Sequence, residues 1–150
     1  MAAIWMRPGR GRLDDRGGVA VFVAVCVVAL IGIIGLAVDG GGKLRATERA
    51  DYIATEAARA GGQAIDPAQA IPGTAIAVGP QAAQAAAQAY LRSAGVAGTV
   101  TVSADGKTLT VTTTGSYATK FLPVVGTGSL PVTGHGKAIL LHGVTAPEGP

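Results

Sequence analysis

The chain has 150 residues and a formal net charge of +3, and 49% of its residues are hydrophobic but only 4% are aromatic. With so few large side chains to line a deep cavity, this composition favours packing surfaces over ligand pockets. The small excess of 12 basic over 9 acidic residues argues against nucleic acid as a partner. The single cysteine, Cys26, excludes an intramolecular disulfide and a cysteine-based metal site.

Residues 1–17 are polar and rich in glycine, which predicts a flexible arm and not a folded unit. The basic residues of this arm are Arg7, Arg10, Arg12 and Arg16. Basic residues beside a membrane span favour the cytoplasmic side, where anionic lipid head groups attract them. We therefore expect a cytoplasmic basic arm.

Residues 18–38 contain no charged or strongly polar side chain. As a helix they would extend roughly 31 Å, which matches a hydrocarbon core of about 30 Å. We expect one transmembrane helix in the plasma membrane, with the N-terminus cytoplasmic and the C-terminal domain extracytoplasmic. Arg16 and Asp39 flank it as membrane-boundary residues.

A cleaved secretory signal is the alternative for this stretch, because such signals also begin with a basic arm and an apolar run. Their apolar region normally covers only about 7 to 15 residues and ends at a small-x-small cleavage site. Here the run is longer, and Ala37, Val38 and Asp39 form a poor cleavage site. The sequence therefore favours an uncut anchor.

Three glycines, at 40–42, follow Asp39, and each weakens a helix by about 1 kcal/mol relative to alanine. We expect the spanning helix to end or bend here, with Asp39 capping the next helix or turn. Residues 39–65 form the expected stem, whose helix covers Lys43 to Gly62.

One face of the stem helix is a stripe of small residues, which would let another element approach closely. The residues that define this alanine stripe are Ala46, Ala50, Ala54 and Ala57. The stripe could pack on the chain's own ectodomain or on another subunit. Charged side chains occupy the remaining faces, with the i,i+3 pairs Arg45–Glu48 and Glu56–Arg59 expected to form weak ion pairs.

Residues 66–79 contain several prolines and predict a loop, and residues 80–143 form the expected head. In the head, residues 81–94 are rich in alanine and glutamine, which predicts a helix begun by Pro80 and stopped by Gly95. Its large side chains, Tyr90 and Leu91, are expected to pack it on a sheet.

Threonine and valine alternate in 99–103 and 108–112, which predicts two strands joined by a two-residue Asp105–Gly106 turn. This register pairs Val102 with Leu109 and Val100 with Val111, so the apolar pairs share one face. Residues 121–125 and, after a glycine-rich loop, 130–141 offer one further strand or more, and residues 144–150 form a flexible tail. The predicted fold class is thus α+β: a transmembrane helix, a helical stem and a small head with an antiparallel sheet.

The candidates for acid–base or ligand chemistry are Lys120, His135 and His142, and no carboxylate or thiol recurs near them at metal-binding or triad spacing. The glycines at 40–42 lack the spacing of a phosphate-binding loop. We therefore expect no enzyme, with no catalytic residue, cofactor or metal.

Several motifs resemble the TadE/TadG-like family of bacterial tight-adherence (Flp) pilus assembly proteins. Within about residues 15 to 65 they are Arg16–Gly17, Gly35–Leu36–Ala37–Val38–Asp39–Gly40–Gly41, Arg49–Ala50–Asp51 and Glu56–Ala57–Ala58–Arg59. Later, Phe121–Leu122–Pro123 and residues 134–139 are similar to the C-terminal part of that family. The resemblance implies a pseudopilin-like minor subunit, or an anchored assembly factor, of a type IV pilus-like secretion apparatus. Its partners would be other pilus or secretion subunits, contacted through the transmembrane helix and the stem.

The resemblance also implies a candidate processing site between Gly17 and Gly18. Members with a pilin-type site carry a glutamate at the fifth position after the cut, where this chain has Phe22. A pilus subunit and a permanently anchored assembly factor therefore both remain open. An alternative from another class is a signal-anchored extracytoplasmic domain that binds a wall component or a small ligand through its sheet, against which the low aromatic content argues.

Overall fold

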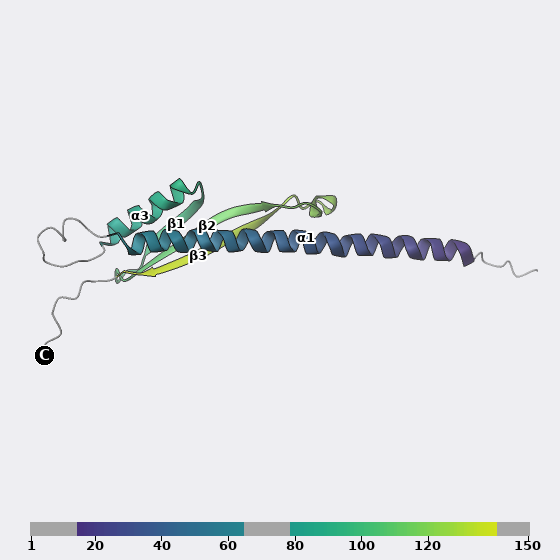
Figure 1. Cartoon of the computed structure of the whole chain (residues 1–150), viewed down its shortest axis with the longest axis horizontal. Helices are drawn as coiled ribbons and strands as arrows, with labels where there is room; N and C mark the ends of the chain where they lie inside the picture. The colour runs from purple at the N-terminus through teal and green to yellow at the C-terminus, as the bar shows by residue number, and fades with distance from the viewer. Residues whose placement is uncertain (1–14, 65–78, 141–150) are drawn as a thin grey trace, which may run out of the picture.

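The computed structural model describes residues 15–64 and 79–140. A long helix, α1 (Asp15–Gly62), runs the length of the molecule, and a small head lies along its C-terminal half (Figure 1). The head consists of helix α3 (Pro80–Ser93), strands β1 (Ala97–Val102), β2 (Thr108–Ala118) and β3 (Ser129–Ile139), and the short 3-10 helix η1 (Leu122–Val125). The predicted α+β fold class is confirmed. The expected loop at 66–79, apart from Gly79, and the expected tail at 144–150 lie outside the described residues.

Helix α1 continues without a break through the three glycines at 40–42. Of the two expected alternatives, an end or a bend, the helix end is wrong, and Asp39 therefore does not begin a new helix. Its 48 residues correspond to about 72 Å of helix. Tertiary packing routinely outweighs the weak helix propensity of glycine, and in this region α1 is packed against the head. Residues 15–17, expected in the flexible arm, form the first turn of α1.

The sheet has the order β1-β2-β3, and both pairings are antiparallel. The predicted register is confirmed, because Val100 pairs with Val111 and Val102 with Leu109. The turn itself differs from the expected two-residue Asp–Gly loop: the Gly106 N–H donates to Ser103 O and the Ser103 N–H to Thr108 O. Gly106 has a φ of 71°, a left-handed conformation that glycine adopts without steric cost.

Of the two stretches that offered one further strand or more, 130–141 covers β3 except for Ser129, whereas 121–125 does not form a strand. Leu122–Val125 is a 3-10 helix instead, ended by Gly126 with a φ of 87°. Pro123 has no N–H to donate to a strand ladder, which disfavours a strand at this point. The loop at 119–128 connects β2 to β3. We call it the β2–β3 loop.

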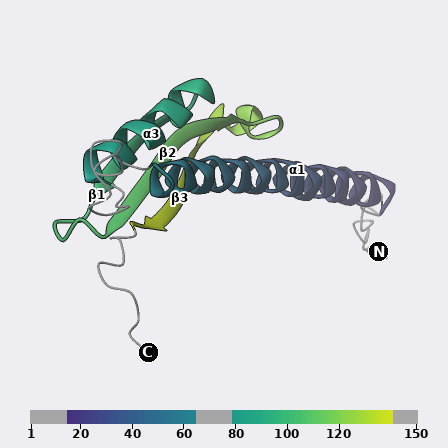
Figure 2. The ribbon, with the colours of Figure 1, turned by 60° about the vertical axis from the view of Figure 1, so that its left-hand side comes forward.

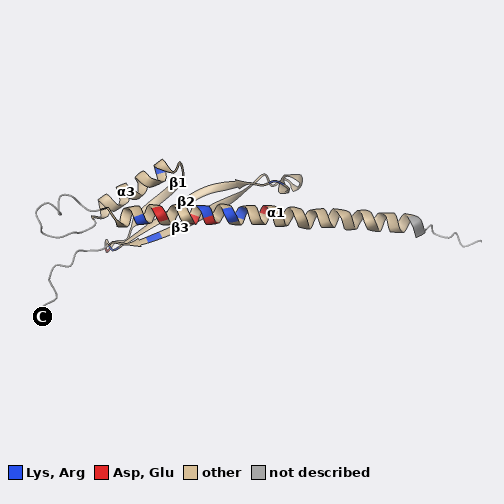
Figure 3. Ribbon diagram, in the orientation of Figure 1, with Lys and Arg blue, Asp and Glu red and all other residues tan. Residues whose placement is uncertain are grey.

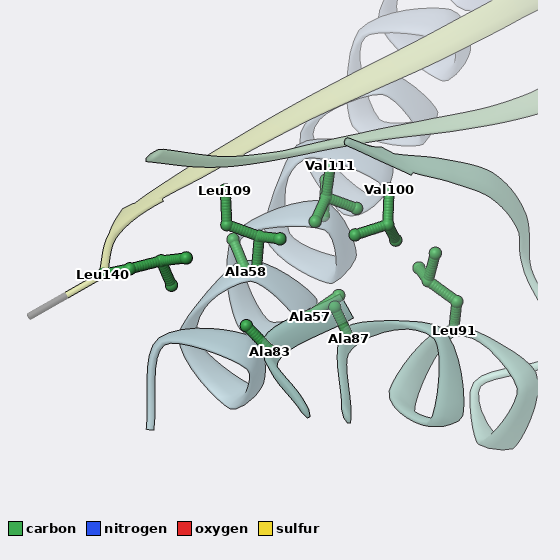
Figure 4. Packing of buried hydrophobic residues seen from close by; sticks show 10 residues of the cluster. Ala57, Ala58, Ala83, Ala87, Leu91, Val100, Leu109, Val111 and Leu140 are labelled. Carbon is green, nitrogen blue, oxygen red and sulfur yellow. The ribbon is translucent and has the colours of Figure 1, made fainter. Parts of the chain in front are cut away.

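The core lies between one face of the sheet and the two helices that cover it, α1 and α3 (Figure 4). The side chains are mostly alanines from the helices and branched aliphatics from the strands. Its buried members are Ala54, Ala57, Ala58, Ala83, Ala87, Leu91, Val100, Val111, Leu109 and Leu140. Leu91 is buried and Tyr90 packs against the same cluster, so the predicted role of these two residues is confirmed. Within residues 15–64 and 79–140, no helix covers the threonine-rich opposite face of the sheet (Figure 2).

Charges divide α1 into two halves (Figure 3). The turns that precede Asp39 show no charged side chain after the N-terminal turn, and the first of them project beyond the head. Among the described residues, α1 is the one helix long and apolar enough to cross a membrane. In the charged half, Glu56 and Arg59 form the expected ion pair at 3.5 Å, whereas Arg45 and Glu48 do not lie within ion-pair distance.

Candidate functional site: the junction of helix and head

Asp39 joins the apolar half of α1 to the head. Its carboxylate is fully buried and accepts three hydrogen bonds from backbone N–H groups of the β2–β3 loop. The Lys120 N–H donates to Oδ1 at 2.7 Å, and the N–H groups of Phe121 and Leu122 donate to Oδ2 at 2.9 and 2.8 Å. One side chain of α1 thus holds the start of η1, which lies more than 80 residues further along the chain.

Those donors also set the charge state of Asp39. Burial alone would raise the pKa of its carboxyl, but the three backbone hydrogen bonds and the nearby positive charge of Lys120 outweigh burial. The pKa of Asp39 is therefore lowered from its ordinary value of 3.8. The group stays ionised at neutral pH and serves as a hydrogen-bond acceptor, not as a general acid or base.

Small residues let α1 and β3 approach until their backbones touch. A Cβ at Gly134 would overlap the carbonyl of Ala50, and a Cβ at Gly136 would overlap the carbonyl of Ala54. Two residues along a strand advance about 6.7 Å, and four residues along a helix advance about 6 Å, so the glycines and alanines stay in step. We call these four residues the glycine–alanine seam.

Polar contacts flank the glycine–alanine seam. The buried hydroxyl of Thr113 donates to the carbonyl of Ala50 at 3.0 Å. The backbone N–H of His135 donates to Oδ1 of Asp51 at 2.8 Å. Asp39 and Asp51 therefore act alike, because each carboxylate on α1 binds backbone N–H groups of the head. These contacts supplement apolar burial and set the position of the head along the helix.

The predicted site residues fall into three groups. Ala54 and Ala57 are fully buried and Ala46 and Ala50 half-buried, so the alanine stripe faces the chain's own head. The candidate processing residues Gly17, Gly18 and Phe22 are exposed near the start of α1, and Arg16 lies in its first turn. Lys120 is exposed in the β2–β3 loop and His135 on β3, whereas His142 lies outside the described residues.

Sequence reasoning missed the glycines that make close approach possible. Besides Gly134 and Gly136, Gly42 gives room to the ring of Tyr117, and Gly35 is buried against Phe121. A usable signal was present in β3, where small or branched residues alternate at 132, 134, 136 and 138. Such a shallow strand face fits a helix that presents alanines, since neither surface has large side chains to hold the backbones apart.

Comparison with known proteins returned one family. Residues 17–64 match the family model described as "Putative Flp pilus-assembly TadE/G-like". No curated protein matches the chain, and no solved structure matches it. The match covers nearly the whole of α1, including Asp39, Asp51 and the alanines of the seam, and leaves the strands of the head outside it. The resemblance is thereby confirmed over residues 17–64, where this chain is similar to the TadE/G-like Flp pilus-assembly family.

Proposed function

We propose that this chain is a non-enzymatic, single-pass membrane component of an Flp-type pilus or secretion apparatus. The observation that carries the proposal is the coincidence of the family match, residues 17–64, with helix α1. That helix supplies both the candidate membrane span and the surface on which the head packs. The arginines of the arm favour a cytoplasmic N-terminus and an extracytoplasmic head.

The acidic residues at the junction support a structural role. Asp39 and Asp51 are both used to hold backbone N–H groups of the head. Within residues 15–64 and 79–140, histidine, cysteine and acidic side chains form no group of three that could hold a metal ion. The helix that carries the family match is thus used for packing and anchoring.

Partner subunits need a surface other than the alanine stripe, which the chain's own sheet covers. The span offers exposed apolar side chains along its length, and the stem adds Leu44 and Tyr52, 60% and 64% exposed. Both are large side chains that are exposed among the charged side chains of the stem helix. The span together with Leu44 and Tyr52 is the partner surface we propose.

Purification from membranes in a mild detergent, followed by identification of bound proteins, tests this function. Other pilus or secretion subunits are expected to be enriched with the wild-type chain and reduced with Tyr52→Ala. Arg92→Ala, which truncates an exposed side chain of α3 outside the proposed partner surface, is the control and should leave the enrichment unchanged. Recovery of the chain with no pilus or secretion subunit would contradict the proposal.

Intact mass of the same purified protein distinguishes an anchored assembly factor from a pilus subunit. Because Phe22 cannot neutralise the new amino terminus of a neighbouring subunit, we expect no cleavage after Gly17 and a chain that keeps residues 1–17. The arginines of the arm would then oppose extraction into a filament. A species that begins at Gly18, recovered with sheared surface filaments, would instead establish a processed subunit.

A further inference from the structure

The β2–β3 loop exposes a cluster of apolar side chains. Val124 is 90% exposed, Val125 74% and Phe121 42%. Together with the half-buried Leu122 they form what we call the apolar tip. Isolated exposed apolar residues need no explanation, but a contiguous cluster on a small domain marks a contact surface.

The apolar tip lies beside the candidate membrane span (Figure 2). Phe121 packs against Gly35, and an open groove of about 430 Å³ separates the tip from α1. On the helix side the groove is lined by Val28, Ile31, Gly32, Gly35 and Leu36. At about 1.5 Å per residue, this stretch begins roughly 5 Å before Asp39 and extends to roughly 16 Å before it. The tip therefore points along the span towards its middle, not away from the membrane.

Arg16 and Asp39, the charged residues at the two ends of the span, limit how far α1 can shift along the membrane normal. If Asp39 lies at the extracytoplasmic boundary, the groove falls in the outer half of a hydrocarbon core about 30 Å thick. Sliding the helix out of the membrane to lift the tip into water would bring Arg16 into the hydrocarbon. That costs about 2.5 to 3.5 kcal/mol for an arginine near the centre of a span, and Arg12 would follow it.

The backbone of the β2–β3 loop suits an apolar surrounding. Lipid offers no hydrogen bonds, so a segment that enters it must satisfy its own N–H groups. Asp39 accepts the N–H groups of Lys120, Phe121 and Leu122. Further along the loop, the N–H groups of Val124, Gly126 and Thr127 donate to Phe121 O, Pro123 O and Leu122 O, while Pro123 has none to satisfy. The apolar tip thus presents apolar side chains outward, while these N–H groups are hydrogen-bonded within the protein.

Interfacial side chains lie just above the tip. Tyr117 and Lys120 line a second groove together with Arg45, at the level of Val38 and Gly42 on α1. Tyrosine favours the membrane–water interface, and lysine and arginine extend their charged ends towards it. Reading outward from the middle of the span, the order is apolar tip, then Tyr117 and Lys120, then the charged stem.

We propose that the apolar tip is embedded in the outer leaflet, with lipid acyl chains filling the groove between the tip and α1. The inference rests on the single span of the proposed function. Lipid is the expected occupant because the groove is lined by residues of the span and is continuous with its exposed apolar surface. The head then contacts the membrane at two places, the helix and the tip, which sets its rotation and tilt against the bilayer.

Depth measurement with single fluorescent labels tests the proposal. In a Cys26→Ala background, the variants Val124→Cys, Leu30→Cys and Thr101→Cys each carry one NBD label, in vesicles of phosphatidylcholine and phosphatidylglycerol. Nitroxides on lipid acyl chains should quench the label at 124 several-fold more than the label at 101, and about as strongly as the label at 30. Iodide, present on both sides of the vesicles, should quench only the label at 101 strongly. Val124 is exposed in the head, so labelling there should not disturb folding.

Three other outcomes overturn the proposal, each for a different reason. Iodide quenching at 124 as strong as at 101 would place the tip in water. Protection at 124 from both quenchers would show that a second copy or another protein covers it. If lipid nitroxides fail to quench the label at 30, the span itself is wrong, and the proposed function fails along with the inference.

Discussion

Gly136→Ala is expected to weaken the attachment of the head to α1 at the glycine–alanine seam. The new Cβ would overlap the carbonyl carbon and oxygen of Ala54 and the next backbone nitrogen, none of which can rotate away. Overpacking of this kind costs roughly 1 to 3 kcal/mol, and rigid backbone on both sides favours the upper end. Thermal unfolding in detergent, followed by circular dichroism, should show a lower Tm.

Gly115→Ala is the matched control, because Gly115 lies on the neighbouring strand β2 and a Cβ there meets nothing within 4 Å. It should leave the Tm unchanged or raise it slightly, since alanine restricts the unfolded chain more than glycine does. Ala54→Leu attacks the same contact from the helix side and is expected to cost about 1 to 3 kcal/mol. Combining Ala54→Leu with Gly136→Ala should cost less than the sum, because both changes disrupt one contact. Equal Tm values for Gly136→Ala and Gly115→Ala would show that α1 and β3 do not touch there.

Asp39→Ala is expected to release the β2–β3 loop from α1, because three backbone N–H groups lose their shared acceptor. Asp39→Asn should have a smaller effect, since the asparagine amide keeps one acceptor oxygen. It should still loosen the loop, because its N–H₂ group would face a backbone N–H donor. Lys120 lies in this loop, so cleavage after it by the lysine-specific protease Lys-C in detergent should accelerate in the order wild type, Asn, Ala. Glu48→Gln, which neutralises an exposed acid on the same helix, is the control and should match the wild type. Equal cleavage rates in all four proteins would refute the role of Asp39.

The pH dependence of the wild-type chain should follow from the same carboxylate. The folded-state pKa of Asp39 lies below the ordinary value of 3.8, so folding favours the ionised form. Its stabilising contribution is therefore complete above that ordinary value and is lost as the pH falls through the lower folded-state pKa. Lys-C cannot work at such pH, so hydrogen exchange of the loop amides is the suitable readout. Asp39→Asn should lack this acid-dependent loosening.

Local patterns predicted the parts of the fold whose contacts are local. Alternating valine and threonine predicted the β1–β2 register, because the side-chain period of a strand decides which residues share a face. The alanine- and glutamine-rich stretch predicted α3 for a similar reason, since helix propensity summed over many residues is informative. Neither prediction needed a distant partner, although α3 also packs against α1.

The parts that could not be predicted depend on partners far along the chain. Residues 121–125 have the composition of a strand, yet Asp39 binds the N–H groups that a strand ladder would need. Likewise, the glycines at 40–42 indicated a helix end, because nothing nearby in the sequence reveals that Tyr117 will pack against Gly42. Asp39 was predicted as a membrane-boundary residue, and that role stays a prediction. Its binding of the β2–β3 loop had no local signal.

The location of the head relative to the membrane tests the central claim most directly, since every proposed role requires one span with the head outside the cytoplasm. The test fuses, after Pro150, either a reporter that is active only outside the cytoplasm or one that is active only inside it. The account predicts activity of the first reporter, inactivity of the second, and retention of the fusion in membranes after alkaline extraction. Activity of the cytoplasmic reporter, or release of the fusion into the soluble fraction, would contradict it.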